Sequence, residues 1–286
     1  MPTSMPTRRP AILARPVPVS PIPLLGRGLV AVAARLQAGP MCHTNESRPP
    51  AAPNAGAVEH AAPIELTAAD GTVFGAYAAV PAAPNGRNVV ILPDVRGVHA
   101  YYRALAERFA EAGFGAVAVD YYGRTAGAGA RGDDFDWPSH LPLVQPDEVT
   151  LDVRAAMSYL DKANPGATFT VGFCFGGGLS WRLAASDLDL AGAIGFYGRP
   201  EQVTDVLDRL RRPLLLLLAG DDAATPQADF RALAGRLTAA GAEHELHTYE
   251  GAPHSFFDRS PAEWSAACDD AWRRVLDFTE RNGSHA

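Results

Sequence analysis

One short stretch constrains the fold of this chain more than any other. Residues 168–173 form a β-rich run, Cys174 follows, and the composition of residues 179–185 favours a helix, which together predict a strand, a tight turn and a helix. In such a turn the central residue is strained and presents its side chain, and the residues two before and two after it must be small. Gly172 and Gly176 meet this requirement. Cys174 is therefore predicted to be a nucleophile.

Other interpretations of this turn have to be weighed. The start of a helix supplies unpaired N–H groups and the positive end of the dipole, which favour a reactive thiolate. A Gly-rich turn can also bind phosphate, but no Lys-Ser or Lys-Thr follows the glycines, and the Gly-x-Gly-x-x-Gly spacing is absent. A buried cysteine that only packs is the commoner fate of this residue type. The motif alone leaves catalysis and packing about equally open.

Strands and helices alternate from residue 64 onward. The predicted strands are 64–67, 72–80, 88–92, 115–119, 168–173, 191–197, 213–219 and 243–249, and the predicted helices are 101–112, 147–163, 201–211, 226–240 and 261–281. Asp70-Gly71 is a hairpin signal between the first two strands, and residues 122–146 are predicted to be a long loop at the rim. Apolar strands without alternation indicate a mostly parallel sheet with helices on both faces. We predict one α/β domain.

The first residues differ in composition from the rest. We predict that residues 1–55 are a disordered or loosely attached head and that residues 56–286 are the folded domain. Residues 1–45 contain five arginines and no acid, which would suit a targeting peptide, and their apolar pieces are too broken to span a bilayer. We prefer a third interpretation, in which translation begins at Met41.

Charge and cysteine content narrow the possible partners and the location. Without those five arginines the net charge falls from −7 to −12, so nothing suggests nucleic acid or an anionic membrane as a partner. Three cysteines, Cys42, Cys174 and Cys268, provide no disulfide framework and indicate a reducing compartment, which we take to be the cytoplasm. Cys268 lies in a predicted helix, where we expect it to pack.

Two further groups follow strands on the carboxyl side, where function gathers in such a sheet. Asp221 and Asp222 follow residues 213–219, and His254 follows residues 243–249. The order nucleophile, acid, histidine is that of the α/β hydrolases. Asp222 could be only a helix cap and His254 only a surface histidine, but the order and placement of all three favour catalysis.

These positions predict a division of labour. Cys174 attacks a carbonyl carbon, His254 takes the thiol proton, and Asp222 orients the imidazole, while Asp221 is left as a turn or cap residue. The backbone N–H groups of Val95 and Phe175 are the expected oxyanion donors. Asp94 would then lie beside the sulfur, where a carboxylate could accept a hydrogen bond from the thiol or disfavour the thiolate until substrate arrives.

Two other clusters are expected to be structural. His244 and His247 lack the helical spacing of a zinc protease motif and would face opposite ways in a strand, so we predict no metal and no cofactor. Asp120 at a strand end is interpreted as structural. Tyr121, Tyr122 and Arg124 are candidates for the rim of the site.

The motifs together resemble the dienelactone hydrolase family, the cysteine branch of the α/β hydrolases. The resemblance covers about residues 64–281 and rests on Gly172-Phe173-Cys174-Phe175-Gly176-Gly177, Gly195-Phe196-Tyr197-Gly198, Gly220-Asp221-Asp222 with Pro226, and Gly251-Ala252-Pro253-His254-Ser255-Phe256. It implies an α/β-hydrolase fold without a large cap domain and a triad of Cys174, Asp222 and His254. It also implies the opening of enol-lactones such as dienelactone to give maleylacetate.

The chain departs from the family at the substrate. Asp94 stands where glutamate is usual, and Asp258 stands where the family would place an arginine that holds the substrate carboxylate. Arg96, Arg124 and Arg259, with Arg131, are the candidates for that anchor.

Three functions remain to be distinguished. We expect a monomer or small homo-oligomer that hydrolyses a small ester or lactone through an acyl-enzyme. The alternatives are a general carboxylesterase or thioesterase with the same triad and a non-catalytic binding module for small molecules.

Overall fold

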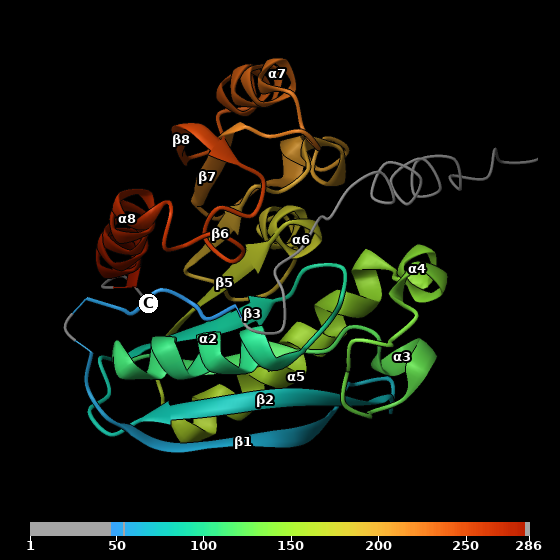
Figure 1. Ribbon diagram of the computed structural model, residues 1–286. Coiled ribbons are helices and arrows are strands. Elements are labelled where there is room, and N and C mark those ends of the chain that lie inside the picture. The colour runs from blue at the N-terminus through green and yellow to red at the C-terminus, as the bar shows by residue number, and fades with distance from the viewer. Residues whose placement is uncertain (1–46, 54, 284–286) are drawn as a thin grey trace, which may run out of the picture.

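The computed structural model describes residues 47–53 and 55–283, so Met41, Cys42 and most of the predicted head lie outside the described residues. Within these residues the chain folds around one eight-stranded sheet in the order β1-β2-β4-β3-β5-β6-β7-β8 (Figure 1). Neighbours from β4 through β8 are parallel, and β1 and β2 are added antiparallel at one edge. The predicted mostly parallel sheet is confirmed.

The strands and helices follow the predicted alternation. The strands are β1 (Val58–Thr67), β2 (Val73–Pro81), β3 (Arg87–Leu92), β4 (Gly115–Val119), β5 (Ala167–Phe173), β6 (Gly192–Phe196), β7 (Leu214–Asp221) and β8 (His244–Pro253). The helices are α2 (Ala100–Glu111), α3 (Gly123–Ala126), α4 (Trp137–His140), α5 (Pro146–Ala163), α6 (Phe175–Leu183), α7 (Gln227–Ala239) and α8 (Ser265–Gly283). Three short 3₁₀ turns in the described part are η1 (Leu141–Leu143), η2 (Pro200–Gln202) and η3 (Leu207–Arg209).

Helices cover both faces of the sheet, with α2 and α5 on opposite sides of its first half (Figure 1). On one face the Phe109 ring of α2 lies 4.8 Å from the Trp272 ring of α8. The leucines of β7 explain why a strand can be apolar throughout. Leu215 and Leu217 belong to the core that includes α2 and α8, whereas Leu214, Leu216 and Leu218 belong to a second core with α6 and α7. Both faces are buried, as parallel strands require.

The predicted helix over residues 201–211 is wrong. The segment contains only η2, η3 and turns, although its buried valines and leucine have helical spacing. Arginine side chains from α6 and α7 account for the difference. The guanidinium of Arg182 donates to the carbonyl oxygen of Gln202 at 3.0 Å, and that of Arg236 donates to the carbonyl oxygen of Thr204 at 2.9 Å. These two carbonyl oxygens therefore accept hydrogen bonds from distant side chains instead of from backbone N–H groups within a helix.

Two smaller features complete the fold. Residues 122–146, predicted to be a loop, contain the single-turn helices α3 and α4 and the turn η1. No helix in the described part of the chain is both long enough and apolar enough to cross a membrane.

Leu216 and Leu246 provide a matched test of this packing, because they face each other in the β7–β8 register. Leu216 is fully buried, whereas Leu246 is 38% exposed. We expect Leu216→Ala to lower the free energy of unfolding by about 2–5 kcal/mol, since it leaves a cavity. Leu246→Ala should cost less than about 1 kcal/mol in the same urea titration. Equal losses would contradict the two-sided core.

Candidate active site

The turn at Cys174 has the geometry of a nucleophile elbow. Cys174 has φ 53° and ψ −114°, a conformation that non-glycine residues rarely adopt. A Cβ on Gly172 would lie 1.9 Å from the carbonyl oxygen of Gly176, and a Cβ on Gly176 would lie 2.1 Å from that of Leu92. Strand β5, helix α6 and the end of β3 thus meet where no side chain fits. The small residues expected on either side of Cys174 are needed for this close approach.

Asp222 and His254 lie together at the carboxyl ends of β7 and β8. The Oδ2 atom of Asp222 is 2.8 Å from Nδ1 of His254, and both side chains are nearly inaccessible to solvent. The Oδ1 atom accepts the backbone N–H groups of Ala224 and Thr225 at 2.8 and 3.1 Å. The cap and the histidine partner, weighed as alternatives from the sequence, therefore coexist on separate oxygens of one carboxylate.

Asp221 differs from its expected place. It is the last residue of β7, opposite Pro253 in the register with β8, and it is exposed rather than part of a turn or cap. The strand ends at Asp221, two residues beyond its predicted end at 219. This extension leaves Asp222, and not Asp221, as the first residue beyond the strand.

The electrostatics of His254 favour its charged form. Burial would lower the pKa of His254, but the negative charges of Cys174 and Asp222, with their hydrogen-bonding capacity, outweigh burial and raise it to about 10. The Nε2 atom makes no hydrogen bond to the described residues. Catalytic hydrogen bonds are often long before substrate binds, so we expect Cys174 to be the source of the proton that Nε2 carries in the charged ring.

Two tyrosines hold the loop after β3, where an oxyanion donor is expected. The Tyr121 hydroxyl donates to the carbonyl oxygen of Asp94, and the Tyr122 hydroxyl donates to that of Val95 at 2.5 Å. A trans peptide points its N–H away from its C=O, so fixing the Asp94 carbonyl also fixes the direction of the Val95 N–H. Both tyrosines are buried, which corrects their expected place at the rim.

Phe175 is linked to the same tyrosine. It is the first residue of α6, so its N–H belongs to the first turn, which has no acceptor within the helix. The Phe175 ring lies 5.6 Å from that of Tyr121. The two expected oxyanion donors are therefore supported by one aromatic contact, although they come from segments far apart in the sequence.

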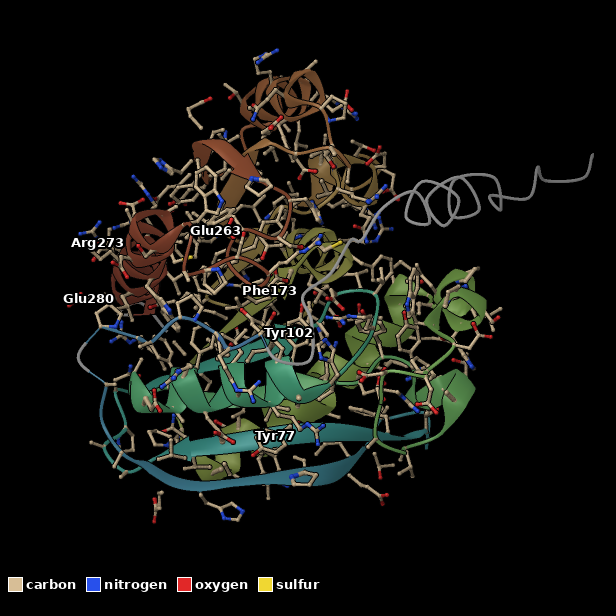
Figure 2. The ribbon with its side chains drawn as sticks, viewed as in Figure 1. Tyr77, Tyr102, Phe173, Glu263, Arg273 and Glu280 are labelled. Atoms are coloured by element: carbon tan, nitrogen blue, oxygen red, sulfur yellow. The ribbon has the colours of Figure 1, made fainter. Side chains whose placement is uncertain are left out.

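Aromatic rings form the floor below the elbow. The Phe173 ring lies 5.8 Å from Tyr102, 4.6 Å from Phe196 and 5.9 Å from Phe257, and Figure 2 labels Phe173 and Tyr102 at the centre of the molecule. The Tyr102 hydroxyl accepts the backbone N–H of Asp94 at 3.0 Å. Charges placed above this apolar floor interact more strongly than they would in water.

The arginines predicted to anchor a substrate are not equivalent. Arg124 is bound to Asp70 and, at 2.8 Å, to Asp152, which directs it to the β1–β2 hairpin and α5. Its proposed place at the substrate therefore loses support. Arg131 is bound in the same way to Asp120 at 2.8 Å, which agrees with the structural role expected of that acid.

The other two candidates stay near the predicted site. The Nε atom of Arg96 is 3.7 Å from Oδ2 of Asp94, and the backbone N–H of Arg96 donates to Oδ1 at 2.8 Å. Arg259 follows the histidine loop, and its backbone N–H donates to the carbonyl oxygen of Ser255 at 2.7 Å. Asp94 is buried in this loop, as the interpretation of a carboxylate beside the sulfur requires.

Sequence reasoning missed Arg199. This residue is 3% exposed, and its Nε and Nη2 atoms make no hydrogen bond to the described residues. Because β6 lies between β5 and β7, Arg199 follows a strand that lies between the strands leading to Cys174 and Asp222. Its position just past a strand is the same signal that identified Asp222 and His254.

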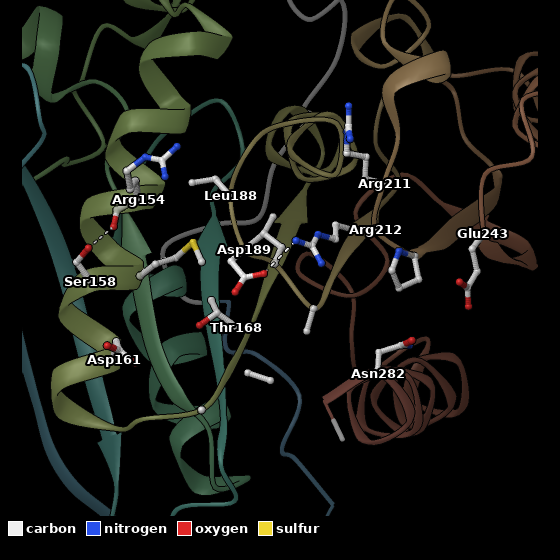
Figure 3. A pocket seen from close by; sticks show the side chains of 16 residues that line it. Arg154, Ser158, Asp161, Thr168, Leu188, Asp189, Arg211, Arg212, Glu243 and Asn282 are labelled. Atoms are coloured by element: carbon white, nitrogen blue, oxygen red, sulfur yellow. Dashed lines mark hydrogen bonds and ion pairs between the residues drawn. The ribbon is translucent and has the colours of Figure 1, made fainter. Parts of the chain in front are cut away.

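A large cavity lies at the amino ends of the parallel strands, opposite the carboxyl ends that carry Cys174, Asp222 and His254 (Figure 3). Its volume is about 760 Å³, and it is lined by residues at the amino ends of strands, including Thr168, Ala191 and Pro213. Arg212 and Asp189 in its wall pair with each other at 3.0 Å. Since ligands of such sheets bind at the carboxyl ends, we place the candidate site at Cys174 and not in this cavity.

Comparisons with known proteins agree with this geometry. The model of the dienelactone hydrolase family matches residues 74–282. A "putative carboxymethylenebutenolidase" of Escherichia coli strain K12 is 30% identical over 211 residues, 68% of this chain and 77% of that protein. Its Salmonella typhi counterpart is 29% identical over 265 residues, 84% of this chain and 97% of that protein. A crystal structure described as a dienelactone hydrolase, "putative", from Klebsiella pneumoniae has a TM-score of 0.65 at 26% identity and covers 77% of this chain and 98% of its own.

The elbow can be tested with two glycines. We expect Gly176→Ala to lower the free energy of unfolding by about 2 kcal/mol or more, because the new Cβ meets backbone that cannot move away. Gly235→Ala in α7 is the control, since its Cβ would meet nothing within 4 Å. That change should instead add up to about 1 kcal/mol through helix propensity. A Gly176→Ala protein as stable as wild type in urea would contradict the close approach.

Proposed function

Because the chain belongs to the dienelactone hydrolase family, we propose that it cleaves a small ester or lactone through an acyl-enzyme on Cys174. The family makes the chain a carboxylic-ester hydrolase. The observation that carries the proposed mechanism is the 2.8 Å contact between Asp222 and His254, on the same sheet edge as the strained Cys174. Nucleophile, base and orienting acid then follow one another as they do in other triads.

Acylation begins with the thiol of Cys174. His254 takes the thiol proton at Nε2 while Asp222 holds Nδ1–H and stabilises the imidazolium. The thiolate adds to the carbonyl carbon of the substrate, and the oxygen becomes an oxyanion. The N–H groups of Val95 and Phe175 are the donors proposed for it. When the tetrahedral intermediate collapses, the carbon–oxygen bond to the leaving group breaks and Nε2 protonates that oxygen.

Deacylation uses the same groups in reverse. His254, now neutral, removes a proton from a water molecule that attacks the thioester. The carbon–sulfur bond breaks, the thiolate leaves, and the carboxylic acid product departs. The imidazolium remains beside the thiolate, and this agrees with the raised pKa of His254, which burial opposes and Cys174 and Asp222 support.

Arg199 supports a substrate that carries a carboxylate. A guanidinium remains charged at working pH, and an unpaired buried charge is costly, so an arginine of this kind calls for an anionic partner. Its place between the ends of β5 and β7 suits the acid group of an enol-lactone, the substrate class that the relatives' name indicates. The alternative is a neutral ester, favoured by the engagement of Arg124 and Arg131 elsewhere.

The first test concerns the nucleophile. We expect Cys174→Ala to lower kcat for cis- or trans-dienelactone and for p-nitrophenyl acetate by on the order of a thousandfold or more, because no other group forms the thioester. Steady-state assays and intact mass spectrometry of the acylated wild type measure this. Cys268→Ala is the control, since Cys268 is buried in α8. An active Cys174→Ala enzyme would refute the acyl-enzyme.

The second test concerns the anchor. Arg199→Met should raise KM for dienelactone by about 10–100-fold, as expected for a lost charged hydrogen bond. Its kcat/KM for neutral p-nitrophenyl acetate should change by less than about threefold. Arg211→Met serves as the control, because Arg211 is exposed at the other edge of the sheet. Equal losses on both substrates would indicate damage to the fold, and no loss on either would favour the neutral ester.

A further inference from the structure

Asp258 is a buried acid that the triad does not use. It lies four residues after His254 in the loop beyond β8 and is fully buried. Neither carboxyl oxygen makes a hydrogen bond to the described residues. A carboxylate in such a place is costly, since burial removes its hydration and the nearby Tyr197 and Ser255 hydroxyls compensate for only part of that loss. The turn of this loop does not require the carboxyl group, because the hydrogen bond from residue 258 to the Ser255 carbonyl oxygen uses the backbone N–H.

The groups around Asp258 come from every element packed against it. They are Asp94 after β3, Tyr101 on α2, Tyr197 after β6, Cys268 on α8, and His254 and Ser255 in its own loop. Burial and the neighbouring Asp94 raise the pKa of Asp258 to about 7, although His254, Tyr197 and Ser255 oppose the shift. His254 is the cation among these neighbours. The acid can therefore change its charge beside the histidine within the working pH range.

Tyr197 joins Asp258 to the ring of His254. It has φ 37°, a strained conformation for a bulky residue, and its ring lies 5.0 Å from that of His254 and 5.7 Å from that of Phe256. Its hydroxyl is buried and makes no hydrogen bond of ordinary geometry to the described residues, but it lies near enough to Asp258 to favour the ionised form of that acid. Strain of this kind persists where the surroundings enforce it and is common at active sites. The Tyr197 ring therefore contacts His254, while its hydroxyl and the Asp258 carboxyl group are two buried polar groups beside the histidine loop.

We propose that Asp258 is a second positioning carboxylate for His254, which stabilises the imidazolium once its own proton has left for solvent, with Tyr197 holding the ring between them. The inference rests on the acyl-enzyme function. Asp258 makes no bond to the substrate. The proton on Nε2 of His254 comes from Cys174, and the proton that Asp258 loses goes to water. A neutral Asp258 leaves the imidazolium supported by Asp222 alone, so the rate of acylation depends on the charge of both acids.

The charge of Asp258 determines how kcat/KM and folding stability should change with pH. Below pH about 7 Asp258 carries its proton, and above it the carboxylate is charged, so kcat/KM should rise with pH through that value. Stability should change in the opposite direction, because the pKa of Asp258 is higher in the folded than in the unfolded chain. The folded state then binds the extra proton between about pH 4 and 7, and stability falls as pH rises through that window.

Asp258→Asn is the test, since the amide is neutral at every pH and nearly the same shape. With p-nitrophenyl acetate, wild type should show the rise in kcat/KM near neutrality, and the variant should lack it and be about tenfold slower at pH 8. Its melting temperature should exceed that of wild type at pH 8 and match it at pH 4. Asp221→Asn, an exposed acid at the end of β7, should keep the wild-type profile. An Asp258→Asn enzyme that retains the rise would overturn the proposal.

Tyr197→Phe provides a second test of the role of Asp258 if the Asp258→Asn protein does not fold. Loss of the hydroxyl, which favours the ionised form of Asp258, should move the rise in kcat/KM to higher pH. A rise that does not move would count against the role of Asp258. Failure of the acyl-enzyme function would look different, because no acyl adduct would then form on Cys174 of the wild-type enzyme.

Discussion

The close approach of three backbones at Cys174 is the constraint on which the site depends. Gly172 and Gly176 allow β5, α6 and the end of β3 to come together, and the cysteine between them is forced to a positive φ. The same contact brings the Asp94–Val95 loop to the start of α6, where the two proposed oxyanion donors lie. Tyr121 and Tyr122 then fix the carbonyls of that loop. The proposed nucleophile and the proposed oxyanion site are thus parts of one junction.

The buried charged side chains are of two kinds: those that have a partner within the chain and those that do not. Arg124 with Asp152, and Arg131 with Asp120, are buried pairs that bind segments of the chain together. Asp222 is also satisfied, by two backbone N–H groups and His254. Burying a charge without such partners normally destabilises a protein, so it persists where function needs it.

The sequence was sufficient for the features that depend on local pattern. The run of leucines predicted a strand buried on both faces, and strand ends located Asp222 and His254. It failed where long-range contacts decide. The segment 201–211 has helical spacing, but Arg182 and Arg236 occupy its carbonyls from other helices. The partners of Arg124 likewise lie 54 and 28 residues away, at Asp70 and Asp152, which no spacing rule could show.

The volume of the cavity and the chemistry of the side chains point to different places for the active site. The pairing of charged groups favours the carboxyl ends of the strands. The cavity of about 760 Å³ lies at the amino ends of the strands, where Arg212 and Asp189 neutralise each other. The carboxyl ends have buried atoms without hydrogen bonds of ordinary geometry to the described residues, namely Nε and Nη2 of Arg199, both carboxyl oxygens of Asp258 and Nε2 of His254. A buried polar group without a hydrogen bond is costly to the folded chain, and a cluster of such groups is therefore a candidate place for a substrate or a proton transfer. Their concentration around Cys174 is therefore a stronger sign of function than volume.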